Sequence, residues 1–222
     1  FYNLSYKYNQ TNGGAYVYGQ LFPQALGKIA VLPPWPTYAF ARSPDYNNLY
    51  FNPKITYKPW PNRKPASQIN DIHSVPYNAN KTGGPQIDLD PTGLDQGVFE
   101  VSAGMRKTYS GSAINAGSGA FSNGSYGETQ QIKYFPATFY LKASSKTGAR
   151  NKAGPDFSNY LKSAIQPVSS TGPENSTNPI TLYRFRIRPA NFSGSGYYAA
   201  INNFANWFTY HRTRSGAVKN AI

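Results

Sequence analysis

Apolar and polar positions follow a helical period at the C-terminal end of the chain. Residues 197–222 contain no proline, and Ile201, Phe204, Ala205 and Phe208 recur at the i, i+3, i+4, i+7 spacing of one helix face. This spacing predicts a long amphipathic C-terminal helix that buries an aromatic stripe. Trp207 and Tyr210 lie off this stripe, and we expect them to face a second element. The last turns are expected to expose a basic end with Arg212 and Arg214.

A period of two dominates the stretch before that helix. In residues 181–187 the apolar side chains of Leu182, Tyr183, Phe185 and Ile187 alternate with arginines, which predicts a half-buried strand with an arginine-bearing outer face. That face carries Arg184 and Arg186, followed by Arg188. Further strands are predicted as a tyrosine-rich hairpin over 1–20, at 87–90 and 97–101, and over 132–141 as one strand with a proline bulge or a strand pair.

Proline and small residues mark the irregular parts of the chain. Residues 44–65 hold five prolines, which leaves at most a short edge strand at 55–57. We expect an ordered loop pinned by the rings of Tyr50, Phe51, Tyr57 and Trp60; the alternative is a polyproline-type ligand for a partner groove. A linker composition is found at 108–127, an exposed loop is expected at 142–155, and Asp156 is expected to cap a short helix ending at Gln166.

Composition adds a strong positive charge to this pattern. The 222 residues include 22 Lys and Arg against 9 Asp and Glu, a net charge of +13, with 32 Tyr and Phe together and no cysteine. So many aromatic residues argue against global disorder, and so much proline and glycine against a helical bundle. We therefore expect a loop-rich α+β fold with short antiparallel strands. Two regions are predicted, 1–127 with net charge +4 and 128–222 with net charge +9, which either fold separately or pack as one unit.

Few residues in the chain are typical of a catalytic or metal site. Asp88, Asp90 and Asp95 lie near Gly93, but the spacing of a calcium loop breaks after the second carboxylate. Two histidines, His73 and His211, without cysteine argue against zinc. No nucleophile elbow or phosphate loop is found. We predict no enzyme, no metal and no cofactor, and no apolar run reaches the length of a membrane span.

Two longer stretches carry a family resemblance. Residues 203–214, NFANWFTYHRTR, resemble the NFANWYSYYRTR signature of the PilC/PilY family of type IV pilus proteins. Residues 46–60, YNNLYFNPKITYKPW, resemble that family's YNPLYYNPxxTYxPW segment, and Phe40-Ala41-Arg42-Ser43 fits just upstream. The two resembling stretches occur in the same order as in that family, and the resemblance covers roughly residues 38–61 and 180–214.

The resemblance implies a secreted protein at or near the tip of a bacterial pilus that promotes pilus assembly and surface attachment. It also implies part of a von Willebrand factor A-like domain; 156–160 (DFSNY) superficially resemble that domain's Asp-x-Ser-x-Ser metal site, with Tyr160 in place of the last serine. The family's C-terminal β-propeller and its calcium loop are absent from these residues, so we expect a fragment, a split subunit or an incomplete chain. The expected partners are minor pilins, other filament subunits, the remainder of the same polypeptide, and an acidic host or surface polymer.

Two groups of residues are assigned roles on this basis. Partner contact is predicted for Arg184, Arg186, Arg188, Arg212 and Arg214, and structural packing for Tyr50, Phe51, Tyr57, Trp60, Phe204, Trp207 and Phe208. An alternative function is a basic-aromatic binding module for nucleic acid or acidic polysaccharide. A further rival is a hydrolase, in which His73 would be the first residue to replace.

Overall fold

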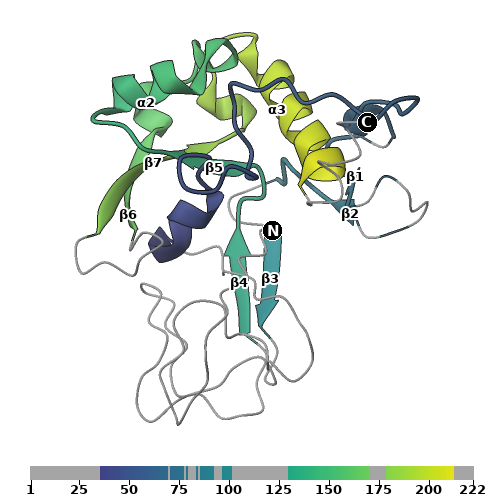
Figure 1. Cartoon of the computed structure of the whole chain (residues 1–222), viewed down its shortest axis with the longest axis horizontal. Helices are drawn as coiled ribbons and strands as arrows, with labels where there is room; N and C mark the ends of the chain where they lie inside the picture. Colours follow the sequence, from purple (N-terminus) through teal and green to yellow (C-terminus); the bar gives the residue numbers. More distant parts are fainter. Residues whose placement is uncertain are drawn as a thin grey trace.

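Short helices and three small antiparallel sheets make up the described part of the chain, which confirms the α+β class (Figure 1). The computed structural model describes residues 36–69, 71–77, 79, 84, 86–92, 97–101, 130–170 and 179–212. The predicted tyrosine hairpin over 1–20, the linker at 108–127, Asp95 and Arg214 lie outside the described residues.

The largest sheet has three strands in the order β5-β7-β6. Its central strand β7 (Ile180–Arg186) pairs on one side with β5 (Thr138–Leu141) and on the other with β6 (Gln166–Ser170). The structure therefore confirms the strand predicted from the alternation over 181–187, and it places this strand at the centre of the sheet. Phe139 lies opposite Phe185 in the register, and their rings stack at 4.9 Å.

A tyrosine side chain continues the hydrogen-bond ladder of β7 beyond Gln166, the first residue of β6. Tyr160 is fully buried, and its hydroxyl both accepts from the Arg186 N–H and donates to the Arg186 carbonyl, each at 3.0 Å. The Asn191 side-chain amide donates to the same hydroxyl and the same carbonyl. Because the backbone of Arg186 has no partner strand on this side, these groups satisfy polar atoms that burial would otherwise leave unpaired.

The two faces of this sheet pack against different elements. One face contributes Phe139, Leu141, Phe185 and Ile187 to the main core, beneath the C-terminal helix. The other face is covered by a 3-10 helix, η2 (Pro36–Arg42), whose Phe40 N–H donates to Ser170 Oγ. Because both of its faces are covered, the sheet forms a middle layer.

The stretch 132–141 contains two strands that belong to different sheets. β4 (Gln130–Tyr134) pairs with β3 (Gly97–Val101), and this ribbon extends away from the central sheet and the labelled helices in Figure 1. β5 follows after the break at residues 135–137 and enters the central sheet. The proline therefore separates two strands, and they do not pair with each other. A third pairing joins β1 (Val75–Pro76) and β2 (Gln86–Ile87).

Two sequence predictions between β5 and β7 are wrong. Residues expected to form an exposed loop contain the helix α2 (Lys146–Ala153), capped by Ser145, whose Oγ accepts from the Gly148 N–H. It has no apolar stripe to reveal it, because only its alanines are buried. Conversely, the helix predicted from Asp156 to Gln166 is broken into the 3-10 turns η5 (Pro155–Phe157) and η6 (Lys162–Ala164).

The C-terminal helix is present but shorter than predicted among the described residues. α3 (Gly196–Asn206) continues directly into a π-helical turn, η8 (Trp207–His211), where the Arg212 N–H bonds to the Trp207 carbonyl five residues back. Its first residue must be glycine, because a Cβ there would lie 2.2 Å from the Asp156 carbonyl oxygen.

Both predicted regions contribute to one core. The main cluster of buried residues draws Tyr50, Phe51 and Leu89 from the first region and Phe139 and Phe204 from the second. The remaining elements, η7 (Pro189–Asn191) and α1 (Ala66–Ile69), lie at the two ends of α3, with α1 packed against it. Within the described ranges, no helix has the length and apolar character needed to cross a membrane.

Candidate functional site

The end of the C-terminal helix is enclosed on all sides by two loops. Trp207, Phe208, Thr209 and Tyr210 are four consecutive buried residues, although a helix lying on a surface would expose at least one of them. The π-helical turn lets successive side chains reach different neighbours. Thr209 Oγ1 donates to the Pro76 carbonyl and Phe208 packs on Tyr77, while Trp207 and Tyr210 bond to the carbonyls of Leu49 and Lys64. We call residues 46–66 the proline-rich segment; together with this helix end it forms the candidate site.

Two asparagines on α3 bind the backbone of the proline-rich segment. Asn203 Oδ1 accepts from the Tyr57 N–H at 2.7 Å, and its amide donates to the Ile55 carbonyl at 2.8 Å. Asn206 lies three residues further along the same helix face. Its amide donates to the Tyr57 carbonyl at 3.0 Å, and its oxygen accepts from the Ala66 N–H at 2.9 Å. The asparagine side chains thus supply the hydrogen bonds that a neighbouring strand would give an irregular segment.

The π-helical turn adds three more side-chain bonds to the same backbone. Trp207 Nε1 donates to the Leu49 carbonyl at 3.1 Å, His211 Nε2 donates to the Lys58 carbonyl at 2.7 Å, and the Tyr210 hydroxyl donates to the Lys64 carbonyl. One bond runs the other way, from Trp60 Nε1 to the Tyr210 carbonyl at 3.0 Å. We call Asn203, Asn206, Trp207, Tyr210 and His211 the clamp.

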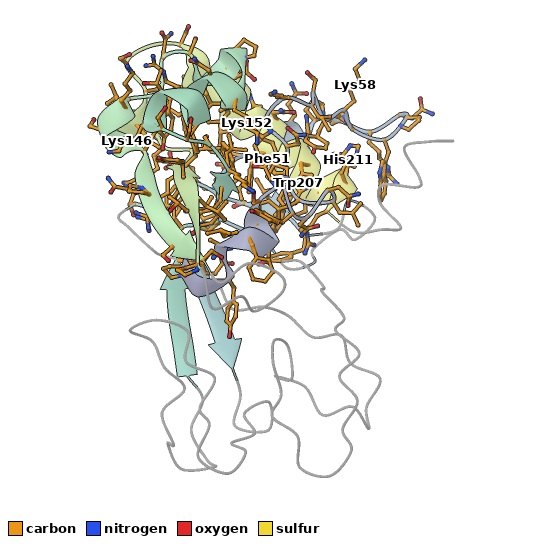
Figure 2. All side chains as sticks on the ribbon, turned by 60° about the vertical axis from the view of Figure 1, so that its left-hand side comes forward. Phe51, Lys58, Lys146, Lys152, Trp207 and His211 are labelled. Carbon is orange, nitrogen blue, oxygen red and sulfur yellow. The ribbon has the colours of Figure 1, made fainter. Side chains whose placement is uncertain are left out.

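Aromatic packing fills the space beneath these hydrogen bonds. The Trp207 ring lies 4.7 Å from Tyr50 and 5.1 Å from Phe204, and Phe51 lies 4.9 Å from Phe204. Tilted and edge-on pairs at such distances contribute about 0.5–1.5 kcal/mol each beyond burial alone. The labels in Figure 2 show Phe51 and Trp207 inside the molecule, with His211 beside them near the rim.

The rim of the site carries half-buried aromatic residues. Tyr57 packs edge-on against His211 at 5.1 Å, and Trp60 against Tyr210 at 5.4 Å. Burial raises the pKa of the Tyr57 phenol, an effect opposed by the Asn52 N–H that it accepts. Burial also raises the pKa of Tyr210, while the charge of Arg63 opposes the rise. Both phenols are therefore neutral hydrogen-bonding groups near neutral pH.

Arg212 is part of the packing at the helix end, which corrects the prediction of an exposed basic end. Its guanidinium lies 4.5 Å from the ring centre of Phe208 and 5.1 Å from that of Tyr77. It donates to the Phe208 carbonyl at 3.1 Å and to the Tyr77 carbonyl at 2.9 Å. Burial lowers the pKa of Arg212, and this is the direction expected of a cation enclosed by rings and carbonyls.

The strand arginines lie half-buried on the sheet face that η2 covers, so that face is not the open outer surface the alternation predicted. Arg184 is directly opposite Tyr140 in the register, and residues in opposite positions share a face. Arg42, at the end of η2, lies over that same Tyr140 ring at 5.5 Å. Arg188 lies over the Phe135 ring at 5.4 Å. Arg186 follows the same alternation and is also half-buried.

The structure keeps the predicted catalytic candidates apart from the clamp. His73 Nδ1 lies 2.9 Å from Asp88 Oδ1, and the His73 side chain is 51% exposed. Asp90 accepts from the Tyr197 hydroxyl at 2.6 Å, and burial together with this carboxylate raises the pKa of Tyr197. Asp156 lies in η5, and the Tyr160 hydroxyl is bonded to Arg186 in the sheet ladder. Among the described residues no three His, Asp or Glu side chains gather as a metal-binding group.

The sequence assigned seven aromatic rings to structural packing, but it did not predict the clamp. Tyr50, Phe51, Phe204, Trp207 and Phe208 are buried, while Tyr57 and Trp60 are half-buried. The asparagines were missed because polar residues off an apolar stripe resemble ordinary solvent-facing positions. The one available signal was the family resemblance of residues 46–60, which contain Tyr57, and of residues 203–214, which contain both asparagines.

Comparison of the chain with protein-family models, with curated proteins and with solved structures gives no match.

Proposed function

We propose that this protein works by contact, without catalysis, as part of a type IV pilus tip adhesin or pilus-biogenesis factor of a bacterium. The observation that carries the proposal is the clamp, which joins the two stretches that resemble the PilC/PilY family. Asn203 and Asn206 come from one stretch, and the backbone of Tyr57 that they bind comes from the other. Direct contact between the two stretches supports the proposal, because it places both parts of the resemblance in one structural unit.

The proposed location is the cell exterior, at the pilus tip, and the fold is proposed to be part of a von Willebrand factor A-like domain with insertions. In this proposal the clamp stiffens a scaffold that docks on minor pilins or on another section of the same polypeptide. A rigid scaffold suits this role, since preformed surfaces lose less conformational entropy on docking. Arg214, which lies outside the described residues, stays a proposed contact residue. Arg184, Arg186, Arg188 and Arg212 are half-buried, and we assign them to support of the fold.

Deletion of the gene in its source bacterium tests the proposal. We expect fewer surface pili in sheared fractions and weaker attachment to a surface, both restored by the wild-type gene supplied in trans. An Asn203→Ala, Asn206→Ala double variant should restore less than the wild type because the clamp is lost. The matched control is Asn202→Ala, on the same helix. Normal piliation and attachment in the deletion strain would contradict the proposal.

A further inference from the structure

The outer side of the proline-rich segment carries a dense set of cations. Lys54, Lys58 and Lys64 are exposed, and so is Arg63. The sequence has no acidic residue between Asp45 and Asp71, so every charge within this stretch is positive. Like charges on one exposed segment repel one another, and an anionic partner offsets that repulsion. We call the three lysines the lysine ridge.

The backbone beneath the lysine ridge is held in place from below. Residues 55–66 have six backbone groups bound by clamp side chains: the carbonyls of Ile55, Tyr57, Lys58 and Lys64 and the N–H groups of Tyr57 and Ala66. The inward side of the segment is therefore occupied by hydrogen bonds. Its lysine side chains extend outward from a fixed backbone, as Figure 2 shows for Lys58, which points away from Phe51 and Trp207. Fixing the backbone in advance lowers the entropic cost of binding a ligand across it.

The same arrangement narrows the class of ligand. Single-stranded nucleic acid binds through rings on which bases stack, but Tyr57 and Trp60 are half-buried and already packed on His211 and Tyr210. A protein segment that inserts into a membrane surface needs an exposed apolar face. Ile55 is the one large apolar side chain of the segment that is exposed. Compact ammonium groups on a polar ridge suit carboxylates spaced along a hydrated polymer.

We propose that the lysine ridge binds an acidic polysaccharide, with Lys54, Lys58 and Lys64 pairing with carboxylates along the polymer. This names a ligand for the contact function above, and its biological setting rests on that function. Binding by the purified chain is nevertheless a separate property, so the gene-deletion experiment and the binding experiment can fail independently.

Titration of the purified full chain with polygalacturonate, a uronic acid polymer, tests the proposal. The ridge variant is Lys54→Gln, Lys58→Gln, Lys64→Gln. The matched control is Lys142→Gln, Lys146→Gln, Lys162→Gln, whose side chains lie on or near α2, and Figure 2 shows Lys146 well apart from Lys58. Both variants remove three charges and leave a net charge of +10 from the original +13. Far-ultraviolet circular dichroism and thermal melting establish that both are folded.

We expect the ridge variant to bind polygalacturonate about tenfold more weakly near 0.1 M salt, a change of about 1.4 kcal/mol, and the control to stay within about threefold of wild type. Equal weakening in both variants overturns the proposal, since binding then follows net charge alone. Absence of polygalacturonate binding by the wild type also overturns it. So does ridge-dependent binding found only with oligothymidylate or only with phosphatidylserine vesicles, since each assigns the ridge to a different polymer or surface.

Discussion

Asn203 and Asn206 together bind both backbone polar groups of a single residue, Tyr57, from which they are separated by 146 and 149 residues. Asn203 Oδ1 accepts its N–H at 2.7 Å and Asn206 Nδ2 donates to its carbonyl at 3.0 Å. Tyr57 belongs to a segment with four nearby prolines, which have no N–H to give a sheet ladder. The helix side chains therefore determine the course of a segment that regular secondary structure cannot fix.

Replacement of Asn206 by alanine should destabilise the fold. It leaves the Tyr57 carbonyl and the Ala66 N–H without their partners, and each partly buried orphan group costs about 1–3 kcal/mol. We expect the free energy of unfolding in urea to fall by about 2 kcal/mol or more. Asn202→Ala is the control, and it should change the free energy by less than about 0.5 kcal/mol. Equal stability of the two variants would show that the clamp bonds do not hold the segment.

Gly196→Ala should also destabilise the chain, at the other end of α3. Its Cβ would lie 2.2 Å from the Asp156 carbonyl oxygen, a backbone atom that cannot rotate away. We expect a loss of about 3 kcal/mol, measured as a lower midpoint of thermal unfolding. The comparison variant is Gly148→Ala in α2, where the nearest atom is the Ser145 hydroxyl at 3.3 Å. A Gly196→Ala protein as stable as Gly148→Ala would contradict the close approach.

Arg212→Lys separates packing from partner contact. A lysine cannot stack on Tyr77 and Phe208 while donating to both of their carbonyls, so we expect a loss of about 1–3 kcal/mol in the free energy of unfolding. Urea denaturation measures it. Unchanged stability combined with weaker binding to a filament subunit would instead favour a contact role for this arginine.

The buried tyrosines should make the fold labile above pH 10. Burial raises the pKa of Tyr160 from 10 to about 12, and it raises the pKa values of Tyr50 and Tyr134 as well. Unfolded chains lose these protons first as the pH rises through 10. For Tyr160 the stabilisation is thus complete below pH 10 and is lost between pH 10 and 12, about 2–3 kcal/mol in all.

Urea denaturation at a series of pH values, with absorbance at 295 nm to follow tyrosinate, measures this loss. We expect stability to fall steeply above pH 10, and Tyr160→Phe to show a shallower fall from a lower starting value. The free energy of unfolding of Tyr160→Phe is lower below pH 10 because the hydrogen bonds to Arg186 are lost. A Tyr160→Phe protein with the same slope as wild type would rule out Tyr160 as a contributor.

Periodic parts of the fold could be predicted from the sequence. The alternation around Phe185 identified β7, and the spacing of Ile201 and Phe204 identified α3, because each pattern marks the side that packs in the main core. The same reasoning failed for α2, whose buried residues are two alanines too small to mark a stripe. The prediction also failed for Arg212, because the sequence around an arginine does not show whether its side chain stacks on rings or faces solvent.

The clamp lay beyond prediction for a different reason. Whether Asn206 faces water or the backbone of Tyr57 depends on which distant loop comes to rest against the helix, and no local pattern encodes that choice. The π-helical turn at Trp207–His211 adds to the difficulty. It rotates the residues after α3 away from the period of 3.6, so Trp207 and Tyr210 become buried although they lie off the predicted stripe.

The wide separation of the clamp partners determines when this fold can close during synthesis. Tyr57 emerges from the ribosome 146 residues before Asn203. At about 5–20 residues per second, the wait lasts roughly 7–30 s. Throughout that interval residues 55–66 lack the side chains that bind their backbone, so this part of the fold cannot close before residues 203–211 have been made.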